Sequence, residues 1–327
     1  MYVIGIDGGG TRTTGVLVNP YGEIKAKYTV GASNPNLIEK SVLQKELLTL
    51  IMALQRQHPH AFTQVKKIFA AMSGVNHPNQ KREMKDLIDS VLPTAIPVHV
   101  DHDAIAALYA GTFGAPGVVQ IAGTGSITYG INDKGEQDRV GGWGHFVDER
   151  GSGFSLGSAG LKVAFQAYDR QMSRTMLQKQ FMDYFNVTSL PDLIQLIYRT
   201  SNPKEVIAAL GQLVIQTADL KDVTAQQIIW ENGHYMGESI VCLIKKLFKS
   251  SYREREITVV FSGGLFNRFD VFREPIEEMM QKHDLKTRFI IPNIDPVGGA
   301  VIAAFKKEKI TIHNCFTSVF KQGMDGT

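Results

Sequence analysis

Two glycine-rich turns, far apart in the chain, each connect one hydrophobic strand to the next. The first is Asp7–Thr13, within residues 1–18, and the second is Gly123–Ser126, within residues 117–131. Glycine permits positive φ and close approach of the backbone to a ligand. The N–H groups and hydroxyls of such turns can surround phosphate oxygens. The pair therefore predicts a nucleotide phosphate held between two lobes.

A carboxylate leads the first turn. Asp7 ends a run of aliphatic residues, where it would be poorly solvated without a partner. Mg²⁺ is usually held by one or two carboxylates and several waters, so Asp7 is a candidate water-mediated Mg²⁺ ligand. The alternative is an aspartate that caps its own turn. The second turn and the glycine pair in Ser262-Gly263-Gly264 favour the functional interpretation.

A second acidic motif, Asp101-His102-Asp103, lies between a predicted strand and a predicted helix. Asp103 would stand at the helix N-terminus, where a carboxylate is stabilised by the helix dipole. It is either a plain N-cap or a general base that takes a proton from a substrate hydroxyl as that oxygen attacks phosphorus. Its place at the end of the first lobe favours the general base.

The segment Arg139–His145 contains three glycines around Trp143, one of only two tryptophans. Such a composition is poor for a strand or helix, and predicts a rigid loop beside a polar substrate or a turn held by Trp143. Asp148 and Glu149 follow. These adjacent acids suit paired sugar hydroxyls, or form a solvated turn with internal ion pairs.

The surrounding elements predict an α/β protein of two related halves, because strand triplets followed by alternating helices and strands occur twice. The glycine-rich segment 111–117 is the expected crossover. We expect an N-terminal lobe over residues 1–113 and a C-terminal lobe over 114–327, whose last helix could pack back on the first. Helical periodicity covers residues 37–54, with Asn36 as a candidate cap.

Composition excludes several classes of function. The chain has 327 residues and a net charge of +3, which leaves no electrostatic basis for binding nucleic acid or an anionic membrane. No apolar run is long enough to span a bilayer and no signal peptide is evident, so we expect a cytoplasmic protein. Two cysteines in unrelated contexts, Cys242 and Cys315, argue against a disulfide scaffold or a zinc site.

These motifs, taken in order over nearly the whole chain, resemble the N-acetylglucosamine kinase family, within the BadF/BadG-type branch of the sugar kinase, heat-shock ATPase and actin superfamily. The resemblance also uses Ser33-Asn34, Ser73-Gly74 and Pro296–Ala300. It implies two related lobes of ribonuclease-H-like architecture that close a cleft over ATP–Mg²⁺ and an amino sugar. A homodimer is also expected.

The resemblance also implies site residues. Asp103 is the expected base for the sugar 6-hydroxyl. ATP contacts are expected from Gly10, Thr11, Thr13, Gly123, Thr124, Gly125, Ser126, Gly263 and Gly264. Sugar contacts are expected from Asn34, Ser73, Asp103, Gly142, Trp143, Asp148 and Glu149.

One departure concerns the sugar. Family members usually read Gly-Asp-Glu-Gly-Ser after the tryptophan loop, and the aspartate binds the sugar. Here Glu149 falls in that register, unless the loop shifts and Asp148 serves, and Arg150 replaces an acid. Arg150 could face the lactyl carboxylate of N-acetylmuramic acid, or form an ion pair that shapes the loop.

We therefore predict an ATP-dependent kinase acting on N-acetylglucosamine or N-acetylmuramic acid, with glucosamine as a further alternative. Two other classes stay open. One is an ATPase activator of a radical dehydratase, whose iron–sulfur cluster needs clustered thiolates. The other is a nucleotide-dependent sugar sensor without catalysis.

Overall fold

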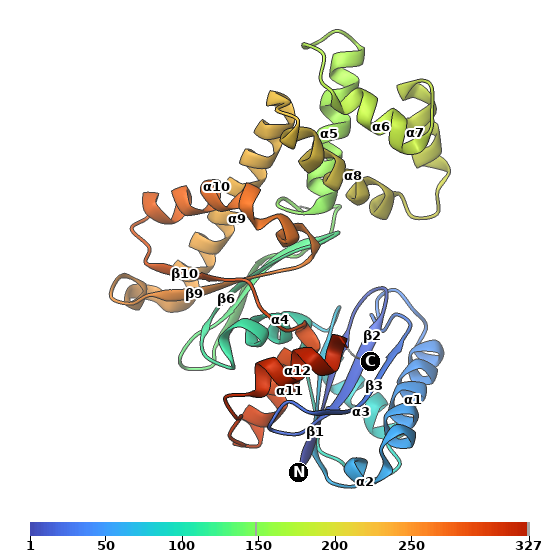
Figure 1. Ribbon diagram of the computed structural model, residues 1–327, viewed down its shortest axis with the longest axis vertical. Helices are drawn as coiled ribbons and strands as arrows, with labels where there is room; N and C mark the ends of the chain where they lie inside the picture. Colours follow the sequence, from blue (N-terminus) through green and yellow to red (C-terminus); the bar gives the residue numbers. More distant parts are fainter. Residues whose placement is uncertain (148, 326–327) are drawn as a thin grey trace. The chain divides into compact units, whose positions relative to one another are not determined.

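The computed structural model describes residues 1–147 and 149–325, apart from the side chains of residues 250 and 251. The chain forms two compact units, drawn in Figure 1. The first contains residues 1–117 and 290–327, and the second contains residues 118–289. These bounds differ from the expected lobes, because the whole segment from residue 290 onward belongs to the first unit.

The first unit is built on a five-stranded mixed sheet with the order β3-β2-β1-β4-β5. Strands β1, β2 and β3 are antiparallel neighbours, whereas β4 runs parallel to both β1 and β5. The strands are β1 Tyr2–Gly8, β2 Thr13–Val18, β3 Ile24–Val30, β4 Val65–Met72 and β5 Val98–His102. The helices are α1 Lys40–Gln57, α2 Pro59–Phe62, α3 Pro78–Val91, α4 Asp103–Thr112, α11 Pro296–Lys307 and α12 Phe316–Asp325.

Helices cover both faces of this sheet. On one face, Ile4 and Ile6 of β1 share a buried core with the apolar residues of α1 and α3. On the other face, α11 lies against β1 and α4 (Figure 1). Gly5 permits this approach, since a Cβ there would lie 2.6 Å from Cγ2 of Val301. A glycine in the strand thus allows α11, and with it Asp295, to lie close to the sheet.

The second unit repeats the same strand plan. Its sheet has the order β10-β9-β6-β7-β8. When the strands of each unit are numbered 1 to 5 along the chain, both sheets have the order 3-2-1-4-5. The strands are β6 Gly117–Ala122, β7 Ser126–Ile131, β8 Gln137–Gly141, β9 Ile257–Ser262 and β10 Thr287–Ile290. The prediction of an α/β protein with two related halves is confirmed.

The helices of the second unit are α5 Gly153–Tyr168, α6 Leu177–Phe185, α7 Leu190–Arg199, α8 Pro203–Asp219, α9 Val223–Phe248 and α10 Phe269–Lys282, with short 3₁₀ helices η1 Lys249–Arg253 and η2 Gly264–Arg268. Helix α9 packs on β7, β8 and α10. Figure 1 shows α6 and α7 at the end of this unit remote from its sheet. Among the described helices, none is long and apolar enough to cross a membrane.

Two local expectations are wrong. The first long helix begins at Lys40, not at residue 37, and its N-cap is Glu39, not Asn36. Asn36 instead donates its side-chain N–H to the Gly74 carbonyl at 3.0 Å, which holds it in the preceding loop. The composition of residues 139–145 predicts no strand, yet β8 extends into this segment as far as Gly141, because β7 supplies an antiparallel partner.

Candidate functional site

The first glycine turn presents its tip to solvent. Its neck is closed by a hydrogen bond from the Gly9 N–H to the Arg12 carbonyl, 2.9 Å long. Gly10 and Thr11 at the tip are exposed. Thr13 is fully buried, and its hydroxyl donates to the Gly31 carbonyl at 2.9 Å. Gly10 and Thr11 are therefore accessible to a ligand, whereas the Thr13 hydroxyl has a structural partner.

Asp7 lies at the end of β1 on the same side of the sheet as Gly5, since alternate strand residues face one side. Burial raises the pKa of Asp7 to about 7, and the negative charge of Asp103 acts in the same direction. Asp295, the N-cap residue of α11, adds a smaller effect of the same sign, and Arg12 opposes it. Asp7 is thus a carboxyl group whose environment favours a proton or a cation.

Strand register explains why these acids lie close together. Asp7 of β1 and Asp101 of β5 both pair with Ala71 of β4. Because β1, β4 and β5 are parallel, their carboxyl ends meet at one edge of the sheet. Asp103 follows β5 directly at that edge.

The alternative that Asp103 is a plain N-cap is wrong. The cap of α4 is His102, whose Nδ1 accepts the Ala104 N–H at 3.0 Å, and Asp103 is the first residue of the helix. The Asp103 side chain is 31% exposed, and its Oδ1 lies 2.7 Å from Nδ1 of His102. Asp103 therefore has no capping role and remains accessible for chemistry.

Asp101 has a structural role in this motif. Its buried carboxylate pairs with Lys81 of α3 and accepts the His102 N–H at 2.9 Å. Burial alone would raise the pKa of Asp101, but its hydrogen bonds with His99 and Lys81 lower it well below the usual range. Asp101 thus remains ionised and anchors the end of β5.

Two of the three predicted sugar contacts of the first unit lie together. Nδ2 of Asn34 lies 3.5 Å from Oγ of Ser73. Backbone hydrogen bonds position both, because the carbonyls of Gly8 and Gly9 accept the N–H groups of Ser73 and Ser33 at 2.7 and 3.0 Å. This polar cluster therefore adjoins the first glycine turn.

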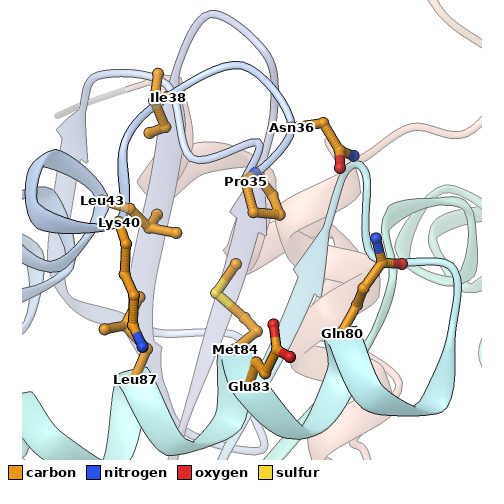
Figure 2. A pocket seen from close by; sticks show the side chains of 9 residues that line it. All are labelled: Pro35, Asn36, Ile38, Lys40, Leu43, Gln80, Glu83, Met84 and Leu87. Atoms are coloured by element: carbon orange, nitrogen blue, oxygen red, sulfur yellow. The ribbon is translucent and has the colours of Figure 1, made fainter.

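A cavity of about 220 Å³ lies near this cluster, between the loop after Asn34 and α3. Figure 2 shows Glu83 and Met84 of α3 on one side and Pro35 and Ile38 of the loop on the other. None of the predicted site residues that the structure describes lines it, so it is separate from those ATP and sugar contacts.

The second glycine turn is supported by the start of α5. The Gly123 N–H donates to the Gly125 carbonyl at 2.9 Å, which closes the turn. The N–H groups of Gly153 and Phe154 donate to the carbonyls of Gly123 and Thr124, at 2.8 and 3.3 Å. A helix N-terminus beside a glycine turn is a favourable environment for phosphate.

The predicted adenosine motif adjoins this turn. Strand β9 runs parallel to β6, with Ser262 opposite Ile121, so the two strand ends are adjacent. Gly263 has a φ of +107° and packs on the Ala122 backbone, where no side chain fits. A Cβ on Gly264 would meet no atom within 4 Å. The structure therefore brings together the two motifs that the sequence assigned to ATP in this unit.

In the tryptophan loop, Gly142 packs closely on Ile127, whereas the Trp143 side chain is exposed to solvent. Gly142 has a φ of +71°, and a Cβ there would lie 2.7 Å from Cδ1 of Ile127. Trp143 is 64% exposed, and the Arg139 guanidinium lies 3.9 Å from its ring centroid. Trp143 is therefore not the buried anchor of a structural turn.

Glu149 lies beside the second glycine turn. Its Oε1 lies 2.8 Å from Nζ of Lys204 in α8, and would lie 3.0 Å from a Cβ on Gly125. The Glu149 side chain is only 6% exposed, and its Oε2 has no hydrogen-bond partner among the described residues. A buried acceptor of this kind can receive a hydroxyl or a water. Asp148, the alternative sugar contact, lies outside the described residues.

Arg150 contacts an aromatic side chain. Its guanidinium lies 4.6 Å from the ring centroid of Tyr235 in α9. This cation–π contact lies within the second unit.

Sequence reasoning missed Asp295, His102 and Lys204 as contributors to these sites. Asp295 could have been found, since Asp-Pro before a helical segment is a typical helix start. No local sequence pattern indicates the contact of Lys204 with Glu149, because the two residues are 55 positions apart in the chain.

Comparison with known proteins agrees with this architecture. The model of the BadF/BadG/BcrA/BcrD ATPase family matches residues 4–304. The chain belongs to the BadF/BadG/BcrA/BcrD ATPase family. Membership of this ATPase family implies that the protein uses ATP.

Two relatives of this BadF/BadG/BcrA/BcrD family member extend over almost the full chain. An N-acetylmuramic acid/N-acetylglucosamine kinase from Clostridium acetobutylicum is 29% identical over 303 residues, which covers 93% of this chain and 98% of the relative. An N-acetyl-D-glucosamine kinase from Dictyostelium discoideum is 29% identical over 315 residues, which covers 94% and 98%.

A solved structure supports the fold of this BadF/BadG/BcrA/BcrD family member. A candidate N-acetylglucosamine kinase from Chromobacterium violaceum aligns with a TM-score of 0.69 and 22% identity, over 92% of this chain and 98% of its own. The predicted α/β fold class with two related lobes is confirmed.

Proposed function

We propose that this protein is an ATP-dependent kinase that phosphorylates the 6-hydroxyl of N-acetylglucosamine or N-acetylmuramic acid. The observation that carries the proposal is the group of Asp7, Asp103 and Asp295 beside the first glycine turn. Such a group suits phosphoryl transfer, which needs a cation beside the phosphates and a base beside the acceptor hydroxyl. Of the two relatives that cover almost the full chain, one is named as a kinase of N-acetylmuramic acid and N-acetylglucosamine, and the other as a kinase of N-acetyl-D-glucosamine.

Each unit, taken by itself, presents groups suited to a nucleotide. Gly10 and Thr11 offer backbone N–H groups from the first unit, and the turn at residues 123–126 offers them from the second. Gly263 and Gly264 leave backbone free of side chains for the adenosine. Such an arrangement acts by positioning and electrostatics, and requires exclusion of water from the reacting groups.

The residues present fit Mg²⁺ held through water. Within the described part of the chain, no cluster of three or more His, Cys, Asp or Glu side chains could hold a metal ion directly. The pKa of Asp7 is raised by burial and by two other acids, so a nearby cation would stabilise its ionised carboxylate. When bound, Mg²⁺ would neutralise charge on the β- and γ-phosphates.

Asp103 is the proposed base. As the 6-oxygen attacks the γ-phosphorus, the O–H bond breaks, the proton passes to the Asp103 carboxylate, and ADP leaves. Asn34, Ser73, Gly142, Trp143 and Glu149 would orient the sugar. We also propose that the protein acts in the cytoplasm, where ATP is available, and that it forms a homodimer, which mass measurement in solution would test.

The activator alternative is disfavoured by thiol placement. Cys242 and Cys315 are exposed, free and located in different units, so the described chain offers no pair of thiolates for a cluster.

The direct test is a phosphorylation assay with ATP–Mg²⁺ and a panel of N-acetylglucosamine, N-acetylmuramic acid, glucosamine and glucose. ³¹P NMR of the product locates the new phosphoester. Turnover of an N-acetylated sugar at its 6-hydroxyl supports the proposal. Sugar and ATP binding without turnover would indicate a sensor instead.

A further inference from the structure

His102 makes two contacts through one nitrogen. Its Nδ1 lies 3.0 Å from the Ala104 backbone nitrogen and 2.7 Å from Oδ1 of Asp103. The His102 side chain is only 12% exposed, so water cannot readily replace either contact.

One imidazole nitrogen cannot satisfy both contacts in the same way. A ring nitrogen either carries a hydrogen and donates, or carries one in-plane lone pair and accepts. Accepting the Ala104 N–H requires the lone pair, and would leave Nδ1 and an ionised Asp103 oxygen as two acceptors 2.7 Å apart. A separation of 2.7 Å is that of a charge-assisted hydrogen bond, which requires a hydrogen between the two atoms.

Among the described residues, the nearby cations contact or act on other acids. Lys81 and His99 both contact Asp101, and Arg12 acts on Asp7. The other charged groups that interact at this edge of the sheet include the acids Asp7 and Asp295, which cannot donate to Asp103 when ionised. His102 is therefore the basic group next to the Asp103 carboxylate.

We propose that His102 is a positioning residue for Asp103. In the active protein its Nδ1 carries the hydrogen and donates it to Oδ1 instead of accepting the Ala104 N–H, and so directs Oδ2 toward the acceptor hydroxyl. This inference rests on the proposed function of Asp103. The arrangement follows the general pattern of a catalytic base oriented by a further group. The proton from the sugar hydroxyl passes to Oδ2, and His102 retains its own proton throughout.

The structure also offers a matched control. His58 caps α2 in the same way, with its side chain accepting the Ala61 N–H at 3.1 Å, and no aspartate follows it in the sequence. Asparagine is a good N-cap, so His102→Asn and His58→Asn each keep a capping oxygen. Only His102→Asn then turns a carbonyl oxygen toward Asp103 in place of an N–H.

The kinetic test compares kcat and KM in the two variants. We expect His102→Asn to keep its melting temperature and both KM values within about twofold, while kcat falls about 10- to 100-fold, the range for a misplaced catalytic group. His58→Asn should keep the wild-type kcat. A wild-type kcat in folded His102→Asn would overturn the proposal, since an acceptor at this position would then serve as well as the N–H donor.

A second measurement does not depend on turnover. In protein labelled with ¹⁵N-histidine, the His102 signals are those that His102→Asn removes. A protonated Nδ1 at pH 7.5 supports the hydrogen bond to Asp103, and an unprotonated Nδ1 overturns it. If wild-type protein phosphorylates no sugar of the panel, the proposed function fails, while this spectrum still decides the His102–Asp103 hydrogen bond.

Discussion

Asp7 makes the first unit less stable at neutral pH, and Asp7→Asn should remove that effect. The pKa of Asp7 rises from 3.8 to about 7 on folding, chiefly through burial. Between these values the folded state holds a proton that the unfolded state releases. The free energy of unfolding therefore falls as the pH rises through this window.

The size of the effect follows from the shift. About 3 pKa units at about 1.36 kcal/mol each give an upper limit of about 4 kcal/mol above pH 7. Asn has the shape of the protonated carboxyl and no charge to desolvate. We expect Asp7→Asn to raise the free energy of unfolding at pH 8 by about 2–4 kcal/mol, and by about 2–3 kcal/mol less at pH 5.

The assay is urea unfolding of wild type and Asp7→Asn in EDTA at pH 5 and pH 8, followed by a phosphorylation assay of each protein. Asp101→Asn is the matched control. The pKa of Asp101 is lowered by its partners, so its loss should reduce stability at pH 8. We expect Asp7→Asn to be more stable but inactive, as is common at functional sites. An equal gain at both pH values, or a loss at pH 8, would refute the reasoning.

Three further predictions concern the proposed site. Asp103→Asn should keep the fold and ATP binding but lower kcat at least about 10²-fold, and near-normal turnover would contradict its role as base. Gly125→Val should weaken ATP binding about tenfold or more in calorimetry, and sugar binding less, because the new Cβ would lie 3.0 Å from Oε1 of Glu149. A larger loss of sugar binding than of ATP binding would exclude a phosphate turn. Arg150→Ala should change kcat/KM by one common factor for N-acetylglucosamine and N-acetylmuramic acid, because Arg150 stacks on Tyr235. A selective loss for the muramic sugar would instead show that Arg150 recognises its carboxylate.

Local chemistry made much of the fold predictable. Strand β3 at Ile24–Val30 and helix α11 at Pro296–Lys307 follow local signals in the sequence, since alternation, proline and glycine act over a few residues. Strand β8 was missed at Gly141, because pairing with β7 outweighs the low strand propensity of glycine.

The sequence alone determined the residue types of the site: two glycine turns led by Asp7, an acid at the start of α4, and a glycine pair after β9. Their order along the chain also determined the repeated strand plan. These features depend on backbone freedom and hydrophobic period, which are properties of short segments.

Only the tertiary structure decided how those residues are paired and charged. Strand register aligned Asp7 with Asp101 across Ala71, and the return of the chain after residue 290 brought Asp295 close enough to raise the pKa of Asp7. Folding also paired Glu149 with Lys204. Burial and charge act through space, and distance along the chain does not limit them, so no local pattern could predict these contacts.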